Sequence, residues 1–262
     1  MSVRVLVTND DGIHAPGLRH LAAALDAAGH EVVVAAPAEE RSGSGTALGD
    51  LADGRQVRVE SVRLDGLAVP AYAVDGPPAF AALCGAIGLF QVEPELVLVG
   101  INPGWNTGRT VLHSSTVGAA VSAASVGLPA VAVSCGPTPG ARFDTAAAIA
   151  VLLLECRGSA LPAGVVLNVN VPDLDLPALR GAAAVPLARR GIHGVRISRS
   201  GEFLQIRHRD LPDSGEVDGD SAAVLAGIVA VTALRPMFVQ FDDTAVIAAA
   251  AALAAALAPA AV

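Results

Sequence analysis

The sequence contains no lysine, and all 17 of its basic residues are arginine. Its 25 acidic residues leave a formal net charge of −8 at pH 7. Such a surplus of negative charge argues against a nucleic-acid duplex or an anionic membrane surface as the partner. A small phosphorylated substrate stays possible where a local site supplies cations or backbone amides.

Aromatic residues and long apolar runs are also scarce. Aromatics make up only 3% of the 262 residues, so a core drawn from the 53% hydrophobic content must consist of alanine, valine and leucine. The length suits one large α/β domain with an appendage. The apolar run at the N-terminus is too short for a signal peptide, and the Ala-rich stretch 244–258 is too short and weakly hydrophobic to span a membrane.

Cysteine is rare and unevenly placed. Cys84, Cys135 and Cys156 are odd in number, far apart and within apolar runs. We therefore expect reduced core residues and a cytoplasmic location.

The most informative stretch begins with Val3–Thr8, an apolar run typical of a buried strand, and continues with Asn9, Asp10, Asp11 and Gly12. Open α/β sheets bind ligands at the carboxyl ends of their strands. Two adjacent carboxylates repel each other, and a hard divalent cation would allow both to stay ionised. The alternative is an ordinary turn in which one aspartate caps the next helix.

Alternating helix and strand patterns follow, and they predict an α/β fold with a Rossmann-like, doubly wound, mostly parallel sheet. Two short predicted strands, 57–59 and 71–74, lie outside the main pattern. The remaining predicted helices are 16–28, 79–89, 117–125 and 144–155, and the remaining strands are 31–37, 96–100, 129–134 and 164–171.

The pattern changes after residue 172. Helical periodicity is weak between 182 and 231, where segments 194–197 and 202–207 are typical of a hairpin. We therefore divide the chain into a Rossmann-like catalytic domain, 1–180, and a region of β-hairpin and terminal helix, 181–262. The nearly all-alanine surface of helix 244–258 suits packing against another element, such as a partner subunit, better than exposure to solvent. We expect a homodimer or homotetramer.

Two loops carry clusters of polar residues. The loop 101–116 is much longer than a βα turn needs, which favours a functional role. Its run Ser114, Ser115, Thr116 precedes a helix whose free amides could help to bind an anion, and capping explains only one of the three hydroxyls. The hydroxyl-rich loop 38–49 could bind a metal or a phosphate, or could be plain loop.

The stretch Val5–Gly17 resembles the N-terminal motif of the SurE family of metal-dependent nucleoside-monophosphate phosphatases. The resemblance continues through residues 36–37, 40–43, 100–108, 114–117 and 167–172. It implies hydrolysis of nucleoside monophosphates, or of another small phosphomonoester, with a divalent cation held by Asp10, Asp11, Ser42 and Asn102. Oxygen ligands of this kind suit magnesium or manganese more than zinc.

The resemblance also implies a phosphate side to the site. Asn106, Ser114 and Thr116 match the phosphate-side positions, and Asn9 and Ser115 are grouped with them as substrate-binding residues. Our mechanistic hypothesis gives the catalytic role to Asp10 and Asp11, one of which accepts a proton from the attacking water. Asp10 is the favoured acceptor.

The chain departs from the family pattern at two places that bear on activity. Pro77 and Phe80 stand where a hydroxyl and an acid are expected, and Ser115 adds a side chain where glycine is expected. The hairpin region is also short for the family. The alternative function is therefore a catalytically weak nucleotide-binding or regulatory protein on the same fold.

Two other enzyme classes fit less well. In a haloacid-dehalogenase-type phosphatase the nucleophilic aspartate would fall on Asn9, whose amide cannot form an aspartyl-phosphate. A two-domain glycosyltransferase needs a second full domain, for which 262 residues leave no room.

Overall fold

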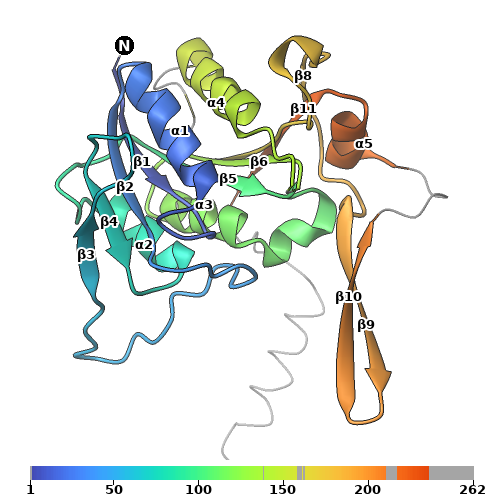
Figure 1. Cartoon of the computed structure of the whole chain (residues 1–262), viewed down its shortest axis with the longest axis horizontal. Helices are drawn as coiled ribbons and strands as arrows, with labels where there is room; N and C mark the ends of the chain where they lie inside the picture. Colours follow the sequence, from blue (N-terminus) through green and yellow to red (C-terminus); the bar gives the residue numbers. More distant parts are fainter. Residues whose placement is uncertain (1, 138, 158–160, 162, 211–216, 236–262) are drawn as a thin grey trace, which may run out of the picture.

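The computed structural model of the protein describes residues 2–137, 139–157, 161, 163–210 and 217–235. A nine-stranded, mostly parallel sheet lies between two layers of helices, with α1 and α4 on one face and α2 and α3 on the other (Figure 1). This confirms the predicted α/β fold. The predicted helix 244–258, with its cap at Asp243 and Thr244, lies outside the described residues.

The sheet has the strand order β3-β4-β2-β1-β5-β6-β7-β11-β8. All neighbouring pairs are parallel except β3 with β4 and β11 with β7. The strands are β1 Arg4–Thr8, β2 Glu31–Pro37, β3 Val59–Val62, β4 Ala71–Val74, β5 Leu96–Pro103, β6 Ala130–Cys135, β7 Val166–Asn170, β8 Ala182–Ala184 and β11 Val229–Leu234. The helices are α1 Pro16–Ala27, α2 Pro78–Ala86, α3 Ser115–Ser125, α4 Phe143–Arg157 and α5 Gly219–Leu225, with 3-10 turns η1 Gly108–His113 and η3 Leu176–Ala178.

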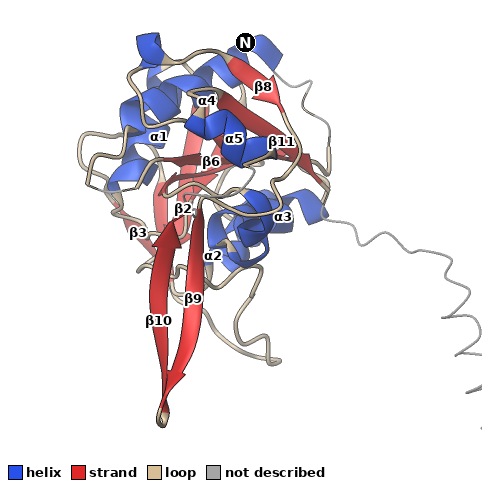
Figure 2. Ribbon diagram, turned by 90° about the vertical axis from the view of Figure 1, so that its right-hand side faces the viewer, coloured by secondary structure: helices blue, strands red, loops and turns tan. Residues whose placement is uncertain are grey.

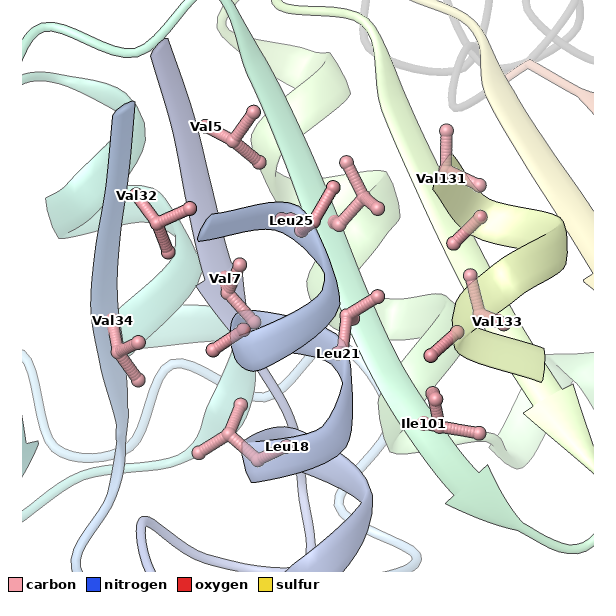
Figure 3. Close-up of a cluster of buried hydrophobic side chains, with 14 of the residues drawn as sticks. Val5, Val7, Leu18, Leu21, Leu25, Val32, Val34, Ile101, Val131 and Val133 are labelled. Carbon is pink, nitrogen blue, oxygen red and sulfur yellow. The ribbon is translucent and has the colours of Figure 1, made fainter. Parts of the chain in front are cut away.

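Each central strand divides its apolar side chains between two cores, because successive side chains point to opposite faces of a sheet. On β1, Val5 and Val7 face the layer of α1 and α4, whereas Leu6 belongs to the core under α2 and α3. Figure 3 shows the first core, where Leu18 and Leu21 of α1 lie over the valines of β1 and β2. Both faces are buried, which explains why these strands are uninterrupted apolar runs.

Two predictions for the region before α2 are wrong. The segments near residues 57–59 and 71–74 do not lie outside the main pattern, because β4 pairs in parallel with β2 and β3 pairs with β4. The strand β3 also covers Val59–Val62, whereas the predicted strand covered 57–59. Exposed β3 covers the sheet edge, and its weak apolar pattern follows from that position.

The C-terminal region is less separate than its sequence suggests. The strands β8 and β11 extend the main sheet, and the short helix α5 was not predicted. The predicted hairpin is present as β9 His193–Ser200 and β10 Phe203–Asp210. Figures 1 and 2 show it projecting from the body. The domain boundary at residue 180 stays a prediction, although two strands from beyond it complete the sheet.

The cysteines match the prediction only in part. All three are free, and Cys135 is buried. Cys84 is half-buried and Cys156 is exposed on α4, so the expectation that all three are core residues is wrong for Cys156. The error arises because α4 is apolar on all sides but covers one face of the sheet, so one side of it still faces solvent. None of the described helices is both long enough and apolar enough to cross a membrane.

Candidate active site

The predicted site residues converge where β1 and β5 lie side by side. The chain leaves β1 toward α1 on one face of the sheet and leaves β5 toward α3 on the other, which opens a crevice at the carboxyl ends of the strands. A cavity of about 480 Å³ lies there. Its lining consists of Asp10, Asp11, Glu40, Ser42, Gly43, Asn102, Pro103, Asn106, Ser114, Ser115 and Thr116.

Asp10 is held in one orientation by its neighbours. Only 4% of its surface is exposed. Thr116 Oγ1 donates to Asp10 Oδ1 at 2.7 Å, and the Arg41 backbone N–H donates to Asp10 O at 2.8 Å. Burial raises the pKa of Asp10, and the hydrogen bond from Thr116 opposes that shift. The strand end and the first turn of α3 therefore fix this carboxylate together.

Asp11 lacks such compensation. Burial, together with the negative charges of Asp10 and Glu40, raises the pKa of Asp11 to about 7. Its Oδ2 atom is buried and has no hydrogen-bond partner among the described residues. The helix α1 has Ala15 at its N-cap and no side-chain cap, so neither aspartate serves as a cap. The ordinary-turn alternative leaves this costly arrangement unexplained.

Glu40 is the site residue that sequence analysis missed. Its Oε1 accepts a hydrogen bond of 3.1 Å from Ser42 Oγ, and its charge acts on both aspartates. The available signal was a carboxylate two residues before the predicted metal-binding serine. The hydrogen bond orients the Ser42 hydroxyl and leaves lone pairs of its oxygen for another partner.

The departure at Ser115 serves to fix the loop 38–49. Ser115 Oγ accepts from the backbone N–H groups of Ser44 and Gly45, at 2.8 and 3.2 Å, and donates to Arg41 O at 3.2 Å. The loop can approach α3 because Gly118 has no Cβ. A Cβ at that position would lie only 2.2 Å from Gly45 O. The added hydroxyl thus holds the loop that carries Ser42.

The hydroxyls of Ser114 and Thr116 also have partners in the protein. Ser114 caps α3 by accepting from the Val117 N–H at 3.1 Å, and Thr116 bonds to Asp10. Asn9 is fully buried, donates from Nδ2 to Gly12 O at 3.0 Å, and is absent from the cavity lining. Their contacts with substrate stay predictions.

Asn106 is fixed by side chains from the adjacent strand ends. Its backbone N–H donates to Asn170 Oδ1 at 2.8 Å, and its carbonyl accepts from the side chains of Asn168 and Asn170 at 2.8 and 3.0 Å. Its own Nδ2 donates to Ser134 Oγ at 2.9 Å. Sequence analysis assigned no role to these three supporting residues, although asparagines within an apolar strand are a visible signal.

The donor set suits a hard divalent cation. Among the described residues no three His, Cys, Asp or Glu side chains gather as a metal site, so a cation here needs hydroxyl and amide oxygens as well. Ser42 could supply the hydroxyl. Asn102 donates from Nδ2 to Gly104 O at 2.6 Å, so its carbonyl oxygen is the atom that could bind a cation. The unpartnered Asp11 Oδ2 fits the same group.

Comparison with known proteins agrees with this geometry. The family model described as "Survival protein SurE" matches residues 5–194. A protein of Synechococcus sp. (strain JA-3-3Ab) named 5'-nucleotidase SurE is 37% identical over 243 residues, covering 89% of this chain and 92% of that protein. One of the same name from Methylococcus capsulatus is 41% identical over 189 residues, covering 72% of each chain.

A solved structure shares the whole architecture. The crystal structure of the SurE protein from Aquifex aeolicus matches with a TM-score of 0.76 at 27% identity, covering 95% of this chain and 99% of that one. The sequence match extends across both polar loops of the crevice and beyond them. The chain belongs to the SurE family.

Proposed function

We propose that the protein is a divalent-cation-dependent phosphatase that hydrolyses nucleoside monophosphates to nucleoside and phosphate. The observation that carries the proposal is the charge of the crevice. Asp10, Asp11 and Glu40 line the cavity, whereas its lining among the described residues includes no arginine or histidine. A phosphate dianion would be repelled there unless a cation bound first. The names of the relatives, 5'-nucleotidase SurE, support the same activity.

The residues divide into two groups by chemistry. Asp10, Asp11, Ser42 and Asn102 would hold the cation through oxygen atoms, with magnesium or manganese as the expected ions. A cation bound there supplies positive charge to the phosphoryl oxygens and acidifies a water for in-line attack. Asn106 and Ser114 also line the cavity, and there they would orient the phosphate.

The remaining residues position these groups. The Thr116 hydroxyl fixes Asp10, and the Ser115 hydroxyl fixes the loop of Ser42. One of the two aspartates takes the proton of the attacking water. Sequence alone favoured Asp10, but Asp10 Oδ1 already accepts from Thr116. In Asp11, one carboxylate oxygen would hold the cation and the other would accept the proton. We therefore assign proton transfer to Asp11.

Assembly is part of the proposal. Large apolar side chains on the hairpin are exposed, from 58% at Val195 to 75% at Phe203. A two-stranded hairpin with such a surface is marginally stable alone. We propose that it packs against a second copy in a homodimer or homotetramer. A cytoplasmic location and the absence of nucleic-acid partners stay predictions.

The direct test is phosphate release from a panel of nucleoside 5'- and 3'-monophosphates by chelator-treated protein. We expect release only after manganese or magnesium is added, and about 1,000-fold less from an Asp11→Asn variant. Folded wild-type protein that binds nucleotide but releases no phosphate with any cation would contradict the proposal and favour the nucleotide-binding alternative.

A further inference from the structure

The carboxylate of Asp220 is the most deeply buried charge that the proposed mechanism does not use. Asp220 lies in the first turn of α5 and has no exposed surface. Among the ion pairs of the described residues, none includes it. A buried acid without a cationic partner is unfavourable unless hydrogen bonds satisfy it, so its bonds indicate its purpose.

Those hydrogen bonds join two segments far apart in sequence. The Gly108 N–H lies 3.1 Å from Oδ1 and 3.0 Å from Oδ2 of Asp220. The Ala188 N–H donates to Oδ1 at 2.9 Å. Gly108 begins the turn η1 of the active-site loop, and Ala188 precedes the hairpin. The Asp220 side chain therefore connects the loop that follows β5 with the base of the hairpin through hydrogen bonds.

Neighbouring contacts make this junction tight. The Ile192 N–H donates to Thr107 Oγ1 at 2.9 Å, and Ser221 Oγ donates to Arg190 O at 3.0 Å. Gly108 has φ +58°, and a Cβ there would lie 2.5 Å from the backbone carbon of Arg190. The backbones thus pass too closely for either segment to move alone.

Gly108 is close in sequence to two residues of the proposed phosphate site. Gly108 follows Asn106 by two residues and precedes Ser114 by six, and these are the two groups proposed to orient phosphate. We infer that Asp220 is a positioning residue of the proposed reaction, whose carboxylate fixes the Gly108 backbone and so the spacing of Asn106 and Ser114. The inference rests on the proposed function and adds to it a residue outside the cavity.

Asp218 provides a matched control. It stands at the N-cap of the same helix, and its Oδ1 also accepts a backbone N–H from the hairpin base, that of Arg189, at 3.0 Å. Asp218 is exposed, and among the described residues its side chain contacts Arg189 and not Gly108. Substituting it perturbs α5 and the hairpin base without touching the active-site loop.

The test compares Asp220→Asn, Asp220→Ala and Asp218→Asn in the full chain. An asparagine keeps one acceptor oxygen but presents an amide donor to its neighbours. We expect Asp220→Asn to lower kcat about threefold to tenfold, and Asp220→Ala more, with the Mn²⁺ dissociation constant changed less than threefold. Asp218→Asn should keep wild-type kcat and KM.

Hydrogen exchange gives a readout that does not depend on activity. In Asp220→Asn, amide exchange across residues 102–113 should be at least tenfold faster than in wild type, while Asp218→Asn leaves it unchanged. Wild-type turnover or wild-type exchange in Asp220→Asn would overturn the inference, as would an equal loss of turnover in Asp218→Asn. If Asp220→Ala does not fold, Asp220→Asn decides.

Failure of the proposed function is a separate result. Wild-type protein that releases no phosphate with any cation would remove the reaction, but faster exchange in Asp220→Asn would still show that the carboxylate fixes the loop.

Discussion

The two sides of the crevice differ in how completely their polar atoms are satisfied. On one side, Asp11 Oδ2 is buried without a donor, and like charges raise the pKa of its carboxyl to about 7. On the other, both backbone polar groups of Asn106 and its side-chain nitrogen are hydrogen-bonded. The first side suits the cation of the proposed function, and the second is a hydrogen-bonded support for Asn106.

The largest effect should come from Asp11→Asn. We expect turnover to fall about 1,000-fold, because the lost ligand and proton acceptor are worth several kcal/mol in the transition state. The metal-free variant should nevertheless unfold at a higher temperature than metal-free wild type, because a repelled, desolvated charge is removed. Steady-state kinetics and calorimetric unfolding measure the two effects. A variant that keeps wild-type turnover would contradict the assignment.

Asn170→Ala tests the side of the crevice on which the polar groups of Asn106 are hydrogen-bonded. The substitution leaves the Asn106 N–H without its acceptor and removes one donor to the Asn106 carbonyl. We expect a loss of about 2–3 kcal/mol in the free energy of unfolding, with the affinity for Mn²⁺ nearly unchanged. Denaturant unfolding and calorimetric titration give both values. Weaker Mn²⁺ binding with unchanged stability would show that this side holds the cation and does not support the fold.

The pH dependence of the metal-free protein should follow Asp11. Its folded-state pKa of about 7 lies above the ordinary aspartate value of 3.8, so the folded protein binds more protons in this window. Stability should therefore rise as the pH falls below 7, by about 1.4 kcal/mol per unit, or about 2 kcal/mol down to pH 5.5. Urea unfolding at several pH values tests this. Asp11→Asn should flatten the dependence, and an equally steep curve in that variant would exclude Asp11 as its cause.

The smallest effect is expected from Ser115→Ala. Loss of the hydroxyl leaves the N–H groups of Ser44 and Gly45 unpaired, at a cost of about 1 kcal/mol. The loop of Ser42 should loosen, and Mn²⁺ affinity should fall a few-fold. Thermal unfolding with and without Mn²⁺ checks both expectations. Unchanged values would show that the loop is held by other contacts.

Sequence predicted best where local pattern and tertiary role coincide. The apolar run of β1, Pro16 at the start of α1, and the run of β2 placed the first βαβ unit within a residue or so. The site residues of the two loops also meet as expected, because parallel strands end at one edge of a sheet.

Sequence failed where distant partners decide. The helix α5 has only seven residues and so shows little helical periodicity. The run of β11 is apolar, but its place in the main sheet depends on pairing with β7 and β8. The supporting roles of Asn168 and Asn170 depend on a loop more than 60 residues earlier. Glu40 gains its importance from its neighbours, and Asp220 gains its importance from its burial and hydrogen bonds, which residue type alone does not reveal.

The most direct test of the central claim is calorimetric titration of chelator-treated protein with Mn²⁺, for wild type and Asp11→Asn side by side. We predict one site per chain in wild type and no measurable binding in the folded variant. Absence of binding to wild type, or equal affinity in the variant, would contradict the proposal that the side of the crevice that carries Asp11 holds a cation.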